Sequence, residues 1–513
     1  MGTIGAGASL FPPIAYFQGQ SPPASGVLDV RGFGARGDEK AIDSPAINRA
    51  IETAASAGGG TVFFPAGSYL CYSIHLRSNI SLYLGPGATI IAADSPQSGS
   101  GGYDPAEPNP WDMYQDFGHS HWHNSLIWGE DLTNISILGP GRIWGRGLSR
   151  GEHDVVLGAG VGNKSISLKN CRNVILRDLS ILHGGHFAIL ATGVDNLTID
   201  NLMIDTNRDA IDVDCCRNVR ISNCSVNSPW DDGICLKSSY GLGFARSTDH
   251  VTITNCYVTG GYEEGTLLDS SYKRIGSGYK APRNGRIKLG TESNGGFRNI
   301  TISNCVIELC RGIALETVDG GLLEDVAISN ITMRDLTDVP FFIRLGRRMR
   351  APQGVPIGRL QRVSIANIIV STGNSSQAAI ISGIPERQIE DVRFSHVYLT
   401  HPGGGTNQDA AVDPPQIPEA YPDPNRFGVI PAYGFFFRNA KGIVMRDVEV
   451  RTVQPDLRPA FFLDNVETAD FSHIRLPSST PLALGFKNVK DFNLTLSRPL
   501  PDTYPASVTQ KTL

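Results

Sequence analysis

The sequence predicts an all-β fold, a single right-handed parallel β-helix in which short strands and turns stack coil upon coil. Three observations lead to this prediction. A strand-like pattern recurs at roughly constant spacing, the chain of 513 residues is long for one ordinary domain, and long Gly- and Pro-rich stretches interrupt the rhythm. Repetition accounts for the length, so we expect one domain over residues 28–513, preceded by a leader or extension over residues 1–27.

The repeat alternates apolar and polar residues, as in RNVILRDLSI (172–181) and DNLTIDNLMI (195–204). This period of two is typical of strands and not of helices. Val174, Leu197 and Val219 are the first apolar residues of three successive repeats, and they are 23 and 22 residues apart. That spacing matches one coil of a parallel β-helix.

The segments outside the repeats are expected to cap the helix or to shape its binding face. Residues 44–67 have apolar positions at helical spacing followed by a Gly-rich stop, which predicts an N-terminal capping helix with long loops elsewhere around a groove. Residues 95–125, 237–284 and 400–432 break the rhythm, and such loops usually carry function. The repeats weaken after about residue 455, so we expect the tail to cover an edge.

The composition excludes several classes of partner. The net charge is −5 and the basic residues are dispersed, so neither nucleic acid nor a membrane surface is an expected partner. The first 27 residues lack a basic start, which is unlike an intact secretory signal. The nine cysteines show no paired spacing of a zinc site. We expect packed free thiols, with one or two disulfides as the alternative.

Four acids concentrate in two successive repeats: Asp209, Asp212, Asp231 and Asp232. Asp231 follows Asp209 by 22 residues, which is one coil, so Asp209 should lie beneath the adjacent pair at a distance of about 4.8 Å along the axis. Adjacent residues of a strand point to opposite faces, but a bend next to Gly233 would bring both acids of the pair into one groove.

Clustered carboxylates raise the pKa of one member, so that it can keep a proton near neutral pH. This suits glycoside hydrolysis, in which one carboxylic acid protonates the leaving oxygen and a carboxylate activates water. Two alternatives remain open from the residues alone. The acids could be solvated turn residues, or they could bind a hard cation such as Ca²⁺.

Several motifs of this chain resemble those of one enzyme family. NRDAID (207–212) precedes DDG (231–233), on a β-helix that opens with VRGFGARGD (30–38) and NSLIWGEDLTNISILGPGRIWGRG (124–147). In this order they resemble glycoside hydrolase family 28, the polygalacturonase and rhamnogalacturonan hydrolase family of pectin degradation. The resemblance spans roughly residues 28–370.

The resemblance implies a role for each acid and requires no cofactor. Asp231 would be the general acid, while Asp209 and Asp232 would position and deprotonate the water, with inversion at the anomeric carbon. The family's N-T-D signature is matched by Asn207-Arg208-Asp209, with Arg208 in the place of Thr.

The chain departs from the family's polygalacturonases at two further motifs. Gly285 stands where the His of G-H-G belongs, and Ala314 and Glu316 stand at the Arg and Lys positions of R-I-K. Arg286 and Lys288 lie outside that frame, so we expect them to supply positive charge from another place or to form structural ion pairs. Ordinary endo-polygalacturonase activity is therefore not expected.

The expected substrate is a rhamnogalacturonan or substituted galacturonan oligosaccharide, attacked from its end because the long insertion 261–283 could wall off the groove. His186, Trp230 and Lys237 are further candidates for substrate contact, each with packing as the alternative. Glu316 would repel a uronate carboxylate or hold sugar hydroxyls.

His119, His121 and His123 alternate as on one face of a strand and could bind a metal, but hydrogen bonding or packing is favoured, and no metal is expected. A calcium-dependent polysaccharide lyase and a noncatalytic carbohydrate-binding β-helix remain the alternatives. The resemblance implies a secreted or periplasmic location.

Overall fold

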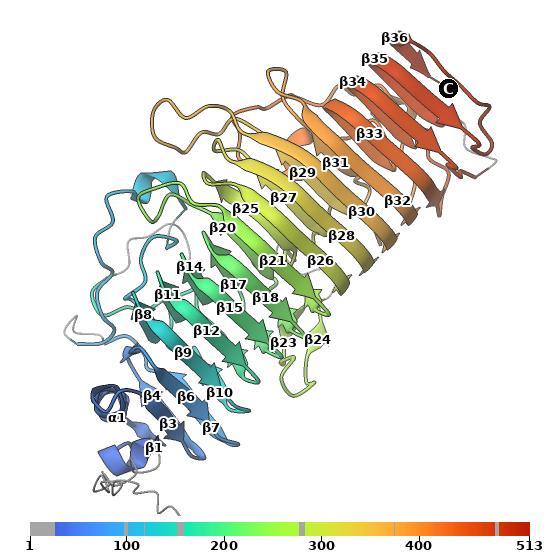
Figure 1. The fold of residues 1–513 in the computed structure, drawn as a ribbon. Coiled ribbons are helices and arrows are strands. Elements are labelled where there is room, and N and C mark those ends of the chain that lie inside the picture. The colour runs from blue at the N-terminus through green and yellow to red at the C-terminus, as the bar shows by residue number, and fades with distance from the viewer. Residues whose placement is uncertain are drawn as a thin grey trace, which may run out of the picture.

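A computed structural model describes residues 26–512 except 97–100, 117, 151–157, 276–282, 374 and 478–481. The predicted fold class is confirmed, because one sheet of 34 strands winds through the described chain as a parallel β-helix (Figure 1). Residues 1–25 lie outside the described part, so the expected leader over residues 1–27 stays a prediction.

The N-terminal end of the β-helix is covered by a helix, as expected. The helix α1 buries Ala46, Ile47, Ala50, Ile51 and Ala54 against the first strands. The elements of this end are β1 (Val27–Asp29), η1 (Val30–Phe33), β2 (Asp38–Ile42), α1 (Ser44–Ser56), β3 (Gly60–Phe64), β4 (Gly67–Cys71), β5 (Ile74–His75), β6 (Ile80–Leu84) and β7 (Ala88–Ala92).

The middle coils are built from short strands joined by tight turns, and the two-stranded ribbon β23–β24 lies outside the main sheet. Their elements are η2 (Asp112–Tyr114), β8 (Ile127–Glu130), β9 (Thr133–Leu138), β10 (Arg142–Trp144), β11 (Lys164–Lys169), β12 (Arg172–Arg177), β13 (Ser180–Leu182), β14 (Phe187–Thr192), β15 (Asp195–Asp200), β16 (Met203–Asp205), β17 (Asp209–Asp214), β18 (Arg217–Ser222), β19 (Ser225–Asn227), β20 (Ile234–Ser238), β21 (Thr248–Thr254), β22 (Tyr257–Thr259), β23 (Tyr262–Glu264), β24 (Lys273–Arg274) and β25 (Ile287–Ser293).

The last coils use longer strands. The expectation that the tail after about residue 455 covers an edge is wrong for β34 and β35, which continue the parallel stack. The final strand β36 runs antiparallel along β35 and covers that edge, as expected of the tail. The elements are β26 (Phe297–Glu308), β27 (Ile313–Thr317), β28 (Leu322–Arg334), β29 (Phe341–Leu345), β30 (Arg359–Ser371), β31 (Ala379–Ser382), β32 (Ile389–His401), α2 (Asn407–Ala410), η3 (Pro424–Phe427), β33 (Phe435–Thr452), β34 (Phe461–Ser472), β35 (Leu484–Thr495) and β36 (Ser507–Thr512).

Like residues stack from coil to coil, as the repeat predicts. Val174 pairs with Leu197, and Leu197 pairs with Val219, all inside the apolar core. On the outside, the Asn196 amide donates to the Asn173 side-chain oxygen at 2.8 Å. Such asparagines have φ near +58°, a left-handed conformation that Asn tolerates well. All nine cysteines are buried free thiols, which confirms the expected state.

Candidate active site

The three acids predicted to be catalytic come together at the ends of two neighbouring strands. Asp209 is the first residue of β17, whereas Asp231 and Asp232 lie in the turn immediately before β20 and not within a strand, where the sequence pattern had placed them. The turn frees both neighbours from strand alternation, so both reach one cavity. The Ala210 amide donates to the Asp232 carbonyl at 3.1 Å, so Asp209 is in register with Asp232, one residue from the expected position.

Oxygen atoms of the three carboxyl groups lie within 4.8 Å of one another. They line a cavity of about 180 Å³. The other residues that line it are Asp116, His119, His186, Arg208, Lys237, Lys288 and Tyr421. The cavity therefore holds three of the expected substrate-binding residues next to the acids.

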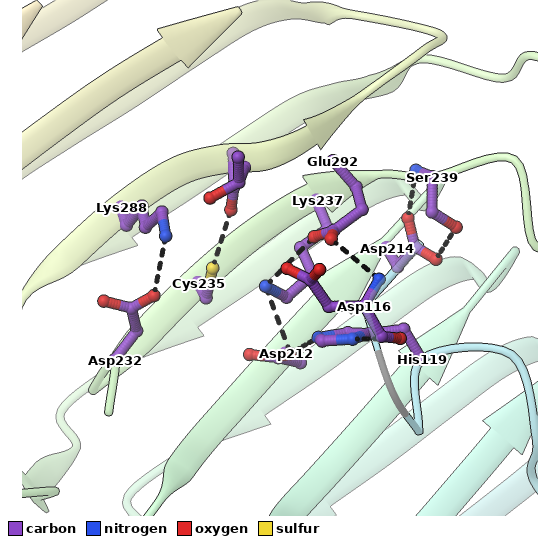
Figure 2. A network of polar contacts seen from close by, with 12 residues as sticks. Asp116, His119, Asp212, Asp214, Asp232, Cys235, Lys237, Ser239, Lys288 and Glu292 are labelled. Atoms are coloured by element: carbon purple, nitrogen blue, oxygen red, sulfur yellow. Dashed lines mark hydrogen bonds and ion pairs between the residues drawn. The ribbon is translucent and has the colours of Figure 1, made fainter. Parts of the chain in front are cut away.

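Asp232 is fixed by two buried cations. Arg286 donates through Nε to its Oδ1 at 2.8 Å, and Lys288 Nζ lies 3.2 Å from its Oδ2 (Figure 2 shows the latter). Burial alone would raise the pKa of Asp232, but the Lys288 and Arg286 charges hold it well below its ordinary value. Asp232 is therefore a carboxylate throughout the neutral range.

Glu316 does not face the cavity, where its place in the motif had led us to expect it. It is fully buried on β27, 3.8 Å from Lys288 Nζ and 3.9 Å from Arg286. Burial raises the pKa of Glu316, and these two cations oppose that rise. Arg286 and Lys288 thus both pair with Asp232 and Glu316, so their charges are balanced within the protein, and of these four residues Asp232 and Lys288 line the cavity.

Gly285, at the expected place of the family's His, has no room for a side chain. Its φ is +46°, and a Cβ would lie 2.4 Å from the backbone nitrogen of Gly260. Its amide donates to the Asp231 carbonyl at 2.8 Å, which holds the acid turn. The backbone at Gly285 therefore excludes a His side chain at this position, so the difference from the family involves the path of the backbone as well as the residue type.

Restoring the family residue with Gly285→His should destabilise the protein by at least about 2 kcal/mol, because both the left-handed φ and the close backbone contact oppose a Cβ. Urea unfolding monitored by circular dichroism measures this change. Gly354→His is the control, since Gly354 also has positive φ but no atom lies within 4 Å of the place that its Cβ would take. Equal losses in both variants would contradict the steric argument.

Asp231 pairs with Arg208, a contact that sequence reasoning missed. One guanidinium nitrogen lies 2.8 Å from Asp231 Oδ2, and the Asn284 amide donates to Oδ1 at 3.4 Å. The departure of NRD from N-T-D was the signal that could have revealed it, because an Arg beside an acid motif is a natural ion-pair partner.

Among the described residues, Asp209 forms no ion pair with a cation, although the charge of Lys237 acts on it from a greater distance. It is 3% exposed, and its Oδ1 has no hydrogen-bond partner among the described residues. Burial first, and then the neighbouring Asp212 and Asp231 carboxylates, raise the pKa of Asp209 well above its ordinary value. The cavity therefore combines an ionised Asp232 with an Asp209 that favours its protonated form.

A second polar network lies beside the acids (Figure 2). Lys237 Nζ is 3.4 Å from Glu292 and 3.8 Å from Asp212, and His119 Nε2 is 3.4 Å from Asp212. Burial and Lys237 lower the pKa of His119, but Glu292 and Asp212 outweigh them and raise it. Lys237 thus lines the cavity while it stabilises these buried carboxylates.

His186 and Trp230 have different surroundings. His186 is 4% exposed, lines the cavity and packs on Phe187 with ring centroids 4.4 Å apart. Burial lowers the pKa of His186 well below its ordinary value, so its neutral form can hydrogen-bond a hydroxyl group. Trp230 is 44% exposed, donates to Glu263 at 3.1 Å and does not line the cavity.

The three alternating histidines do not form one site. His121 lies 3.2 Å from Asp112, His123 lies 2.8 Å from Glu130, and only His119 reaches the cavity. Within the described residues, two groups have ligand atoms close enough for a metal: His119, Asp209 and Asp212, and the three catalytic candidates. In the second group, Arg208 and Lys288 already pair with the carboxylates, which disfavours a hard cation there.

One side of the cavity is closed by loops from distant parts of the chain. Asp116 donates its backbone N–H to Glu292 at 3.2 Å and also pairs with Arg350. The hydroxyl group of Tyr421, from the loop between β32 and β33, lies 3.0 Å from the hydroxyl group of Thr291, within hydrogen-bond distance. These contacts hold Asp116 and Tyr421 in the wall of the acid cavity.

A larger cavity of about 650 Å³ shares one lining residue, Asp116, with the acid cavity. Its wall includes Asn124 and Asn163, whose side-chain oxygens accept hydrogen bonds from the buried Lys164 at 3.0 and 2.6 Å. Burial lowers the pKa of Lys164 to about 7.

This lysine should make stability depend on pH. Between pH of about 7 and the ordinary lysine pKa of about 10.4, the unfolded chain binds the Lys164 proton and the folded chain does not. The free energy of unfolding should therefore rise with pH in this window, and Lys164→Met should remove that rise. Urea unfolding at pH 7 and pH 9 tests this, with the exposed Lys490→Met as control; an unchanged slope in Lys164→Met would contradict it.

Comparison with known proteins gives two family matches. A model described as glycosyl hydrolases family 28 matches residues 114–264, and one described as rhamnogalacturonase A/epimerase, pectate lyase-like, matches residues 27–128. A curated relative, the probable polygalacturonase of Vitis vinifera, is 23% identical over 394 residues, which cover 72% of this chain and 73% of the relative.

Solved structures share the fold. A hyperthermoactive exopolygalacturonase from Thermotoga maritima is 16% identical, with a TM-score of 0.60 over 96% of each chain. The family 28 exopolygalacturonase of Yersinia enterocolitica is 17% identical, with a TM-score of 0.61 over 93% of this chain and 79% of its own. At sequence identities of 16% and 17%, these structural similarities show a shared fold and no more.

The family 28 model and the polygalacturonase relative show that the chain is a glycoside hydrolase, an enzyme that acts on carbohydrate. More particularly, the chain is a glycoside hydrolase family 28-like protein, similar to polygalacturonases. Among the described residues, no helix has the length and apolar character needed to cross a membrane.

Proposed function

We propose that this protein hydrolyses an α-linked terminal sugar of pectin-derived oligosaccharides, namely rhamnogalacturonan or substituted galacturonan fragments. The observation that carries the proposal is the small cavity of about 180 Å³ that holds Asp209, Asp231 and Asp232. A cavity of this size accommodates roughly one sugar ring, which suits removal of a terminal residue better than cleavage within a long chain.

In the proposed reaction Asp231 donates a proton to the glycosidic oxygen as the C–O bond breaks. A water molecule bonds to the anomeric carbon and loses its proton to Asp232, with Asp209 helping to hold the water. We propose inversion, as the family resemblance implies. A carboxylate separation of about 5 Å is usual for retaining enzymes, so the anomer of the first product, read by ¹H NMR, tests this step directly.

The experiment that tests the function is reducing-sugar release from rhamnogalacturonan oligosaccharides and from polygalacturonate, with the products separated by size. Single sugars released from the former support the proposal. Rapid shortening of polygalacturonate to mixed lengths would instead indicate an endo-acting polygalacturonase. Unsaturated, UV-absorbing products that disappear with a chelator would indicate a calcium-dependent lyase.

We also propose that no cofactor is needed and that the protein acts in an extracellular or periplasmic location, where pectic fragments are accessible. Activity that survives exhaustive treatment with EDTA supports the first point. The absence of basic clustering supports carbohydrate and not nucleic acid as the partner.

A further inference from the structure

A group of metal-binding residue types lies beside the catalytic acids. His119, Asp209 and Asp212 each place one ligand atom within 4.8 Å of the other two, and none of the three is more than 4% exposed. His119 comes from the loop between η2 and β8, whereas both acids come from β17. One imidazole and two carboxyl groups form a donor set that suits a divalent transition metal such as Zn²⁺.

The ligand atoms of this group lack hydrogen-bond partners among the described residues. They are His119 Nε2, Asp209 Oδ1 and both carboxyl oxygens of Asp212. Buried polar atoms in proteins nearly always have a partner, and a bound ion is one explanation where they do not. Four such atoms in one small group therefore point to a ligand that they share.

His119 is oriented as a metal-binding histidine usually is. Its Nδ1 lies 3.1 Å from the Asp116 carbonyl oxygen, which can only accept, so Nδ1 carries a proton and donates it. Nε2 is then the ring atom that binds a proton or a metal ion, and it faces Asp212 (Figure 2). Ligating histidines commonly donate their other ring N–H to a backbone carbonyl in this way.

The spacing of the donor atoms matches the coordination of Zn²⁺. Two donors bound to one tetrahedral Zn²⁺ are about 3.4 Å apart, because each lies about 2.0–2.2 Å from the ion. His119 Nε2 and Asp212 Oδ2 are 3.4 Å apart. The Asp209 ligand atom lies within 4.8 Å of both, a gap that a small rotation of its side chain can close.

The charges around the group are compatible with a dication. The nearest printed cation is Lys237, whose Nζ lies 3.4 Å from Glu292 and 3.8 Å from Asp212, so Glu292 is its closer partner. A Zn²⁺ ion would balance the two carboxylates of β17 while Lys237 and Glu292 stay paired.

We propose that a divalent transition-metal ion such as Zn²⁺ binds between His119, Asp209 and Asp212 and inhibits the enzyme. The ion is an inhibitor and not a cofactor. The inhibition rests on the proposed function, in which Asp209 helps to hold the attacking water, whereas the binding does not. An ion held by Asp209 takes that carboxyl group from the water. His119 and Asp209 line the acid cavity, so the ion can reach the group from solvent.

Titration calorimetry with ZnCl₂ tests the binding without turnover. The full chain, stripped with EDTA and then freed of chelator, should bind one Zn²⁺. His119→Ala and Asp212→Asn should each weaken this binding by at least about 10- to 100-fold, a range that is lost even when only a residue that orients a ligand is removed. His250→Ala changes an exposed histidine outside the cavity and should bind as the wild type does. Absent binding in the wild type, or equal binding in the wild type and both site variants, would overturn the proposal.

A spectrum of the wild type keeps the proposal testable if a variant fails to fold. Co²⁺ added to the stripped protein should give a visible absorption band that Zn²⁺ removes by displacement, without the near-ultraviolet band that thiolate ligands produce. A thiolate band would place the ion on the cysteines and overturn the assignment.

Kinetics test the inhibition separately. Saturating Zn²⁺ should lower kcat of the wild type at least about 10-fold on a hydrolysed oligosaccharide, the smallest loss expected when a group that acts in proton transfer and water positioning is taken away, and EDTA should restore it. The residual activity of His119→Ala should be far less sensitive to Zn²⁺. Zn²⁺ that binds without lowering kcat would overturn the inhibitory role. If no glycoside is hydrolysed, the proposed function fails, and calorimetry still decides the binding.

Discussion

Asp231→Asn should lower kcat on an oligosaccharide substrate by about 10³-fold, the effect expected when a general acid is removed. An amide has the shape of the acid but cannot protonate the leaving oxygen. On a 4-nitrophenyl glycoside the loss should be much smaller, because that leaving group departs without a proton. Steady-state kinetics on both substrates give the comparison.

Asp269→Asn is the matched control, since Asp269 is an exposed acid outside the cavity. It should retain wild-type rates. If Asp231→Asn lowers kcat equally on both substrates, Asp231 is not the general acid. Asp209 is then the next candidate, because its pKa is raised.

Lys288→Met should destabilise the protein by about 3–5 kcal/mol, because removing one member of a buried charge network leaves its partners uncompensated. Asp232 would keep its hydrogen bond from Arg286. Among the described residues, Glu316 would keep the hydrogen bond from Thr291 at 3.2 Å and the Arg286 charge at 3.9 Å. Denaturant unfolding followed by circular dichroism measures the loss.

The double variant Lys288→Met/Glu316→Gln removes one cation and one anion, and it should recover part of that stability. Lys441→Met, which breaks an exposed ion pair, should change the free energy of unfolding by less than about 1 kcal/mol. Equal stability of the single and double variants would show that Glu316 does not depend on Lys288.

The fold could be predicted from the sequence because each coil repeats one apolar pattern. Val174 and Leu197, which this pattern aligns, are paired in neighbouring strands of the structure. The acid cluster followed from the same periodicity. The exact alignment of the acids could not be predicted from that periodicity. The turn before β20 contains one extra residue, so Asp209 is in register with Asp232 and not with Asp231.

Contacts that lack a periodic signal could not be predicted. Tyr421 reaches the cavity from a loop 130 residues beyond Thr291, and nothing in either segment marks the pairing. The burial of Glu316 was missed for another reason: its motif position was compared with a family motif, whereas its surroundings depend on Arg286 and Lys288 in the previous coil.

At the two ends of the β-helix, the terminal coils have a neighbouring coil on one side only, and this bears on whether copies of the protein can stack end to end. A parallel stack exposes unsatisfied backbone donors and acceptors at each terminal coil, which could template addition of another copy. Here α1 packs against the first coils, and β36 pairs antiparallel along β35. We expect these two covering elements to leave fewer backbone groups open for another copy, and so to oppose growth into fibres.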